Sequence, residues 1–303
     1  MALFSSILLF ASAYYFYKWS DRNNLCKTYA LLTFTISLWC LLMFLGQLPF
    51  PAQFRILIVN FTPIPTLFVP LCATYIVLNY TRPNDLVSPP KILTLLHSIA
   101  ILGFSFLSLI GYVSPVYFEG DEVRFNASVS YFFVIGYIYF SLFISLGVIA
   151  YNLIFGNYFV RLHSIYLFAG IVLASIVSSI FLVFLPLLGI YLNSLSAIGM
   201  LGFLWLSWIP IAKYRLFNVE LTEFGQDFRN PKLSSVIITI NRYLLNWMDP
   251  KAFKEICDQF ELRRSEEIFG IQAEFILETA YNGENMTEQT RKFSKKVTNI
   301  FLK

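Results

Sequence analysis

Seven apolar stretches, each long enough to cross a lipid bilayer, follow one another through the first 212 residues of this chain. A helix needs about 20 predominantly apolar residues to cross about 30 Å of hydrocarbon. Lipid cannot satisfy a free backbone N–H or C=O group, so each stretch is predicted to be a helix. The alternating pattern of a transmembrane barrel is absent. The predicted spans are residues 2–19, 28–48, 56–80, 92–113, 129–153, 164–188 and 194–212.

Charge divides the chain into two parts. Charged residues make up 13% of the sequence, against about a quarter in a typical soluble domain. Residues 1–212 hold 8 of the 22 Lys and Arg and 5 of the 18 Asp and Glu, and the rest lie in residues 213–303. We therefore predict an all-α polytopic membrane protein. A seven-helix sensor domain spans residues 1–217, and a small helical cytoplasmic tail spans residues 218–303.

Basic residues in the short loops predict how the chain is oriented in the membrane. Six of them fall after the first, third and fifth spans, and two fall after the second and fourth. Because basic loops remain in the cytoplasm, we expect the N-terminus outside and the C-terminus in the cytoplasm of a bacterial inner membrane. The six are Lys18, Arg22, Lys27, Arg82, Lys91 and Arg161, and the two are Arg55 and Arg124.

Away from their ends, the predicted spans contain no Asp, Glu, Lys or Arg. Ion-coupled transport usually relies on such residues inside the membrane, and a hydrolase needs an activated nucleophile with a base. Both functions are therefore disfavoured. The four cysteines are scattered and form no CxxC pair, so no disulfide framework, metal site or cofactor is predicted. We expect a protein that is not an enzyme.

Three prolines interrupt the third predicted span. Each removes a helical hydrogen bond, and the freed carbonyls are tolerated where neighbouring helices or a cavity satisfy them. The span is either a kinked element that lines a ligand cavity or moves, or a static kink packed by Thr62 and Thr66. His97 in the fourth span is either a ligand-sensing residue or a hydrogen-bonded interior histidine. The candidate cavity or switch residues are Asn60, Thr62, Pro63, Pro65, Pro70 and His97.

Three segments carry a resemblance to a known family. They are residues 29–39, the third span between Arg55 and Asn79-Tyr80-Thr81, and the exit at residues 211–218. Residues 1–220 resemble the seven-transmembrane N-terminal sensor region of bacterial histidine kinases and related receptors. The resemblance implies a receptor that passes a signal to whatever follows the seventh span. The tail contains no histidine to accept phosphate and is too short for an ATP-binding domain, so no kinase activity of its own is expected.

The tail is predicted to form four short helices. The first begins at Asn230-Pro231, the second runs from Asp249-Pro250 to Phe260, the third covers residues 264–281, and the fourth begins at residues 285–288. Residues 253–303 resemble a degenerate LuxR-type helix-turn-helix. In such a domain, a basic cluster would contact DNA phosphates. The alternative is that this cluster is a solvated face near an anionic membrane. The cluster consists of Arg291, Lys292, Lys295 and Lys296.

Three hypotheses for the function follow. The leading one is a non-enzymatic signalling receptor in the lipid bilayer, in which an unknown small ligand shifts helix packing. Its tail would report to a cytoplasmic signalling protein, such as a separately encoded kinase, or to DNA, and the receptor would act alone or as a homodimer. The alternative is a transporter or channel-type subunit with a regulatory tail. The third is a degenerate receptor that serves as a scaffold for a separate kinase.

Overall fold

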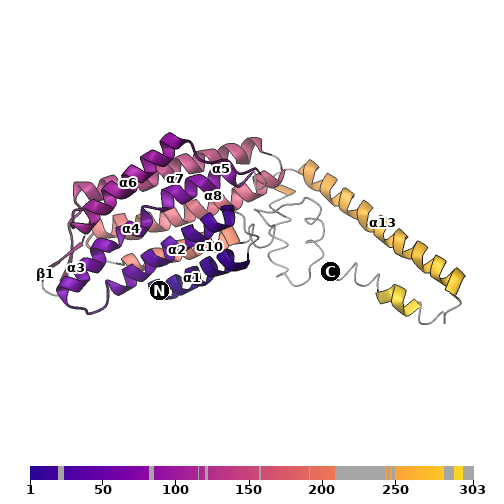
Figure 1. Cartoon of the computed structure of the whole chain (residues 1–303), viewed down its shortest axis with the longest axis horizontal. Coiled ribbons are helices and arrows are strands. Elements are labelled where there is room, and N and C mark those ends of the chain that lie inside the picture. The colour runs from indigo at the N-terminus through magenta and orange to yellow at the C-terminus, as the bar shows by residue number, and fades with distance from the viewer. Residues whose placement is uncertain are drawn as a thin grey trace. The chain divides into compact units, whose positions relative to one another are not determined.

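The structure of the chain is a computed structural model that divides into two compact units, Met1–Asn218 and Val219–Lys303. Helices lie side by side throughout the first unit (Figure 1). The residues that the structure describes are 1–19, 24–81, 85–114, 116–119, 122–156, 158–190, 192–208, 243, 246–247, 250–282 and 290–295.

Each of the seven predicted spans contains a helix, although residues 46–48 and 110–113, which were predicted within the second and fourth spans, lie in turns and bends beyond the helix ends. The first, second, fourth and fifth are α1 (Ala2–Trp19), α2 (Asn24–Leu45), α6 (Lys91–Leu109) and α7 (Val129–Phe155). The third is divided into α3 (Ala52–Phe61), α4 (Pro63–Thr66) and α5 (Val69–Asn79). The sixth comprises α8 (Tyr158–Ser179), the π-helix η1 (Ile180–Phe184) and α9 (Leu185–Leu187). The seventh comprises η2 (Asn193–Leu195) and α10 (Ser196–Trp208), and residues 209–212 lie outside the described residues.

Five helices in the described part of the chain are long and apolar enough to cross a membrane. They are Asn24–Leu45, Ala52–Asn79, Lys91–Leu109, Val129–Phe155 and Val160–Leu187, and Asn193–Ser207 is a shorter apolar helix. In α1, three tyrosines and Lys18 near the end dilute an otherwise apolar sequence. Such residues are typical of the membrane interface.

The first unit is apolar outside and lined with small polar groups inside. In lipid, helices are held together by close packing and by hydrogen bonds between them, because apolar side chains gain nothing by leaving the bilayer. The hydroxyls of Ser6 and Ser37 each donate to the other residue's carbonyl and so join α1 to α2. Tyr29 Oη lies 2.5 Å from Ser207 Oγ and joins α2 to α10. The exposed apolar side chains of α6 and α7 include Leu96, Ile99, Phe133, Phe140 and Phe143.

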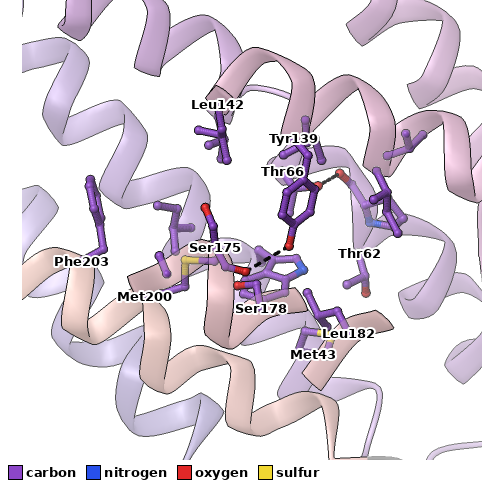
Figure 2. Close-up of a pocket in the computed structure, with 18 of the residues that line it drawn as sticks. Met43, Thr62, Thr66, Tyr139, Leu142, Ser175, Ser178, Leu182, Met200 and Phe203 are labelled. Carbon is purple, nitrogen blue, oxygen red and sulfur yellow. Dashed lines mark hydrogen bonds between the residues drawn. The ribbon is translucent and has the colours of Figure 1, made fainter. Parts of the chain in front are cut away.

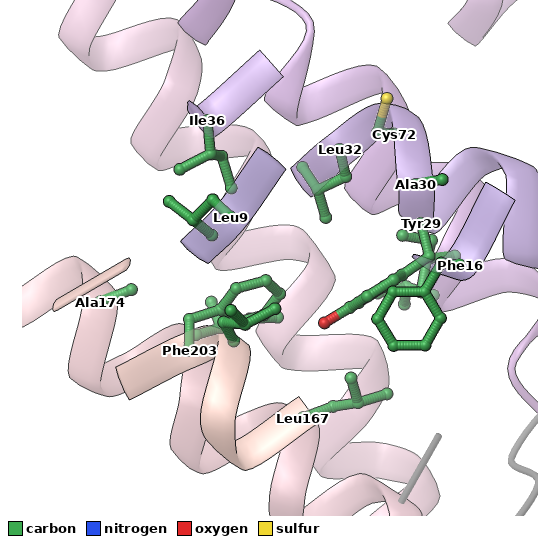
Figure 3. Packing of buried hydrophobic residues seen from close by; sticks show 14 of the residues in the cluster. Leu9, Phe16, Tyr29, Ala30, Leu32, Ile36, Cys72, Leu167, Ala174 and Phe203 are labelled. Carbon is green, nitrogen blue, oxygen red and sulfur yellow. The ribbon is translucent and has the colours of Figure 1, made fainter. Parts of the chain in front are cut away.

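Aromatic packing fixes the α1–α2 contact in the core. The rings of Phe16 and Tyr29 meet edge to face, with centroids 4.8 Å apart. Figure 3 shows these two residues beside one another, with Leu9 and Ile36 packed farther along the same pair of helices. This arrangement leaves the Tyr29 hydroxyl directed toward α10, where it meets Ser207.

Glycines allow α10 to approach α8 closely. A Cβ atom on Gly199 would lie 2.7 Å from Cβ of Val177, and one on Gly202 would lie 2.6 Å from Cδ2 of Leu173. Small residues at such positions let transmembrane helices pack backbone to backbone. The position of the seventh helix therefore depends on the absence of side chains at these two residues.

A two-stranded antiparallel sheet lies between α6 and α7, where the sequence predicts only an outside loop. Strand β1 (Val116–Glu119) pairs with β2 (Glu122–Phe125), and Val116 lies opposite Phe125. The hairpin marks one end of the bundle, which we call the hairpin end. At the opposite end, Asn79 donates to the carbonyl of Val87 and accepts from its N–H, and so fixes the chain after α5.

The second unit contains the long helix α13 (Pro250–Asn282). The predicted break between residues 260 and 264 is wrong, because Glu261, Leu262 and Arg263 are good helix formers and the helix continues through them. A second helical stretch covers residues 290–295, and the rings of Phe275 and Phe293 lie with centroids 4.9 Å apart. The helix predicted from Asn230 and the cap predicted at residues 285–288 fall outside the described residues.

Candidate functional site: a cavity inside the bundle

The first unit contains a cavity of about 650 Å³. Sites for small molecules are typically concave, mostly apolar and about 300–1,000 Å³ in volume. Its lining comes from α2, α3, α4, α5, α7, α8, η1, η2 and α10, so most of the predicted spans contribute to it. The cavity therefore lies between the helices of the bundle.

The lining changes from polar to apolar along the bundle. At the hairpin end it includes Gln47 just after α2, Arg55 in the first turn of α3, and Asn193 in η2. Contacts of η2 with both α2 and η1 hold these segments together. Toward the opposite end the lining is apolar, as at Ile149 and Leu167. The cavity is thus amphipathic along its length.

Ser178 and Asn193 each bring to the cavity a buried polar atom that has no hydrogen-bond partner within the part of the chain that the structure describes. These atoms are Ser178 Oγ on α8 and Asn193 Oδ1. Ser178 is only 5% exposed. A buried polar atom without a partner costs about 1–3 kcal/mol. Groups of this kind are expected where a bound molecule completes the hydrogen bonds.

A hydrogen-bonded cluster joins α7 to α8 at the middle of the cavity. Tyr139 Oη donates to the Ser175 carbonyl at 3.3 Å and accepts from Ser179 Oγ at 2.8 Å. Figure 2 shows the Tyr139 hydroxyl directed toward Ser175, with Ser178 nearby on the same helix as Ser175. Tyr139 and Ser175 both line the cavity, so this cluster forms part of its wall.

The π-helix in the sixth span is paired with a tyrosine. Pro186 has no N–H to donate to the carbonyl four residues earlier, which is that of Leu182. Tyr131 Oη on α7 donates to this carbonyl at 2.9 Å. Tyr131 and Leu182 both line the cavity. A hydroxyl from one helix therefore supplies a hydrogen bond that the proline removes from another.

The structure separates the residues predicted for the third span. Thr62 and Pro63 line the cavity, as does Thr66, whereas Pro65 and Pro70 are buried elsewhere. Thr62 Oγ1 donates to the Ile58 carbonyl at 2.9 Å, and Thr66 Oγ1 donates to the Pro63 carbonyl at 2.7 Å. Both hydroxyls thus bond carbonyls of their own segment, and movement of this span stays a prediction.

Asn60 lies away from the cavity lining. Its carbonyl accepts from Ser108 Oγ at 2.5 Å and so ties α3 to α6. Its side-chain amide lies close to Gly111, where φ of +85° requires a left-handed backbone that glycine adopts readily. Asn60 therefore joins two helices at the hairpin end.

His97 bridges three helices outside the cavity lining. Its Nδ1 lies 2.8 Å from Tyr137 Oη on α7, and its Nε2 lies 3.4 Å from Thr74 Oγ1 on α5. Only 5% of His97 is exposed. One ring nitrogen of a neutral histidine donates and the other accepts, so both hydroxyls find a partner.

Replacing His97 with leucine is expected to destabilise the membrane domain by about 1–3 kcal/mol, because both hydroxyls would be left without this partner. Replacement with glutamine, which keeps a donor and an acceptor, should cost less. Thermal unfolding of the full chain in detergent, followed by tryptophan fluorescence, measures both effects. Equal melting temperatures for the leucine variant and the unmodified protein would contradict the bridging role.

The predicted DNA-contact residues lie in the second unit. Arg291, Lys292 and Lys295 are exposed on the helical stretch 290–295, and Lys296 falls outside the described residues. Residues 253–282 belong to one continuous helix without the turn that a helix-turn-helix needs there. Within the described residues, no group of three or more His, Cys, Asp or Glu side chains could hold a metal ion.

Sequence reasoning missed most of the cavity's polar residues. Arg55 entered only as a loop charge and as the start of a segment that resembles the family, and Gln47, Ser178 and Asn193 carried no signal. Hydropathy averages over all faces of a helix, so it does not reveal which serine of a span faces inward. A break in the sixth span was foreseeable from Pro186. The tyrosine on α7 that donates a hydrogen bond at this break was not foreseeable.

The fold and the cavity define a polytopic helical membrane protein with an internal site of small-molecule size. Residues 1–220 match the family described as the N-terminal 7TM region of histidine kinase, and the chain belongs to this family. The predicted resemblance and the all-α membrane fold are confirmed, and the first unit is a membrane sensor domain. No curated protein and no solved structure matches the chain. The resemblance of the tail to a LuxR-type domain receives no support.

Proposed function

We propose that this protein is a signalling receptor whose internal cavity binds a small ligand and whose tail transmits the result, without kinase activity of its own. The observation that carries the proposal is the cavity itself, which lies within a sensor domain. Ser178, whose buried hydroxyl has no hydrogen-bond partner within the described residues, lines this cavity. Membership of a family of kinase sensor regions supports a signalling role over a catalytic one.

A ligand can shift a receptor only if it binds two helix arrangements with different affinity. Two segments with interrupted helical geometry line the cavity: the third span, which prolines divide, and the π-helix η1. It also contacts Met200 and Phe203 of α10, the helix that precedes the tail. Ligand binding would therefore act on segments that are not locked into a single uninterrupted helix and on the helix that leads to the output.

The output is proposed to lie in the cytoplasm. The basic loops favour an outside N-terminus and a cytoplasmic tail in a bacterial inner membrane. Family sensor regions belong to histidine kinases, so a separately encoded kinase or another cytoplasmic signalling protein is the proposed partner. On α13, Leu262, Phe269 and Ile276 are exposed at seven-residue intervals, a spacing at which helices pair. A search for partners would also distinguish two other outcomes. One is a homodimer, and the other is binding of DNA by Arg291 and its basic neighbours.

The sensor role can be tested by joining residues 1–218 to the cytoplasmic catalytic part of a histidine kinase from the same family. Ser175 lines the cavity, whereas Ile176, the next residue, is 54% exposed on the outer surface. Ser175→Phe is expected to change autophosphorylation in membranes about fivefold or more, the usual scale of allosteric coupling. Ile176→Phe should leave it unchanged. Equal activity of both variants, each shown to be folded by gel filtration, would contradict a sensing cavity.

The transporter alternative predicts flux. The full chain reconstituted in proteoliposomes should then move a labelled solute faster than empty vesicles do, and Ser175→Phe should abolish the difference. The absence of acidic and basic residues from the interiors of the spans argues against ion-coupled flux. The transporter alternative would be favoured if the full chain moves the solute and if Ser175→Phe leaves the activity of the kinase fusion unchanged.

A further inference from the structure

We infer that the cavity takes a neutral single-chain lipid whose head group carries a hydrogen-bond donor, held with its head at Ser178 and Asn193 and its chain extending toward Tyr29. This inference rests on the proposed sensor function and names the chemical class of the ligand.

Two polar atoms locate the head group. Ser178 lies two residues before η1, and η1 contacts η2, where Asn193 lies. Ser178 Oγ and Asn193 Oδ1 are buried without a hydrogen-bond partner within the described residues, and both residues line the cavity. Ser179, by contrast, donates to the Ser175 carbonyl, as serines inside helices commonly do. A bound molecule is therefore needed to complete the hydrogen bonds of the two buried atoms.

The amide oxygen of Asn193 decides what the head group must provide. This oxygen only accepts hydrogen bonds, whereas the hydroxyl of Ser178 can donate or accept. A molecule that satisfies both atoms must therefore carry an O–H or N–H donor. An ionised carboxylate has acceptors only and would leave the Asn193 oxygen without a partner. A hydroxyl group or an amide with an N–H meets the requirement.

The charges of the lining favour a donor that is neutral. Among the described residues that line the cavity, none is acidic, so an ammonium group would find no opposite charge there. An ammonium group buried without an opposite charge costs far more than a buried neutral group. Arg55, a basic residue of the lining, already interacts with another group of the protein and is not a vacant partner for an anion.

Four other hydroxyl groups in the lining already donate to carbonyls of the protein, so their O–H groups are not available to a ligand. They belong to Thr62, Thr66, Tyr131 and Tyr139. A ligand with acceptors along its whole length would find few donors outside the region of Ser178. The ligand is therefore polar at one end only.

The apolar part of the cavity fits one extended chain. On α2 the lining runs from Tyr29 to Met43, a distance of about 21 Å at 1.5 Å per residue. Along it the cavity meets Leu32, Ile36 and Trp39. A volume of about 650 Å³ lies in the range of sites for one drug-sized molecule and is too small for a phospholipid with two long chains.

Trp39 offers a direct readout, because it lines the cavity and is 5% exposed. The full chain carries five tryptophans, of which four would be replaced by phenylalanine. Three probes share one dibrominated octadecanoyl chain, whose bromines quench tryptophan on contact: the glycerol monoester, the methyl ester and the free acid. Each is added to the protein in nanodiscs of phosphatidylcholine. A matched variant keeps only Trp205, which is 80% exposed on α10 and reports probe dissolved in the bilayer.

Quenching of Trp39 by the glycerol monoester should saturate, whereas quenching of Trp205 should rise steadily with the probe in the lipid. The methyl ester has no donor, and the acid has none at an alkaline pH that ionises it. Both should bind at least about tenfold more weakly than the monoester. This comparison requires no substitution at Ser178 or Asn193, so a misfolded variant cannot decide the result.

Substitutions then locate the head group. Asn193→Leu should weaken binding of the monoester about tenfold and leave that of the methyl ester unchanged, because only the monoester donates to this residue. Ser178→Ala should also weaken binding of the monoester. Ser145→Ala is the control, since Ser145 is a buried serine on α7 outside the described lining. A loss of binding in Ser145→Ala equal to that in Ser178→Ala would contradict a head group at Ser178.

Equal affinity for the monoester and the methyl ester would overturn the donor requirement, and tighter binding of the ionised acid would overturn the neutral head group. Quenching of Trp39 that never saturates would overturn the lipid ligand. To test membrane lipid as the source, nanodiscs are also prepared with brominated phosphatidylcholine and no probe. If this lipid quenches Trp39 as strongly as Trp205, the single-chain assignment is wrong.

The kinase fusion separates this inference from the receptor proposal. A fusion that responds to Ser175→Phe while Trp39 shows no saturation would reject this ligand class and leave the receptor proposal intact. Saturable binding of the monoester with a fusion that ignores Ser175→Phe would support the lipid site and reject the receptor.

Discussion

Replacement of Gly199 by leucine is expected to lower the melting temperature of the membrane domain by about 5–10 °C, from an overpacking cost of about 1–3 kcal/mol. A Cβ atom there already lies 2.7 Å from Val177 Cβ, and the atom it meets sits at the rigid base of a branched side chain. The larger leucine must push α10 away from α8. Differential scanning fluorimetry of the full chain in detergent measures the change.

Gly147→Leu provides the matched control. Gly147 lies on α7, and a Cβ atom there meets nothing within 4 Å. Both substitutions add the same side chain to a helical glycine in a transmembrane helix, so helix propensity and hydrophobicity change alike. If Gly147→Leu destabilises the protein as much as Gly199→Leu does, close packing of α8 and α10 is not the cause.

Removal of the Tyr131 hydroxyl is expected to cost about 1–2 kcal/mol, because the Leu182 carbonyl would lose this donor. Tyr131→Phe should therefore lower the melting temperature by about 3–6 °C. Tyr151→Phe is the control, since Tyr151 lies on the same helix and is 62% exposed. Its hydroxyl should be dispensable.

The paired substitution Tyr131→Phe with Pro186→Ala tests the mechanism. Alanine at residue 186 restores an N–H that can donate to the Leu182 carbonyl, as in an uninterrupted helix. The double variant should therefore be more stable than Tyr131→Phe alone. Effects that simply add would show that the hydroxyl and the proline act independently.

The number and order of the spans could be predicted because long apolar stretches in a membrane chain have almost no alternative to helices. The break at residues 63–70 could be predicted from proline chemistry. The cavity could not, because it depends on which face of each helix turns inward and on contacts between residues as distant as Tyr131 and Leu182. The continuity of α13 was also missed, since apolar spacing alone does not separate one long helix from two short ones.

The π-helix η1 has a consequence for the wall of the cavity. Its N–H groups reach back five residues, as from Leu185 to the Ile180 carbonyl, in place of four. One additional residue corresponds to a rotation of about 100° around the helix axis. If η1 changed to α-helical geometry, the residues on one side of it would turn by about this angle relative to those on the other side. A change between π-helical and α-helical geometry in η1 would therefore change both the lining that the sixth helix presents to a bound molecule and the position of one part of that helix relative to the other.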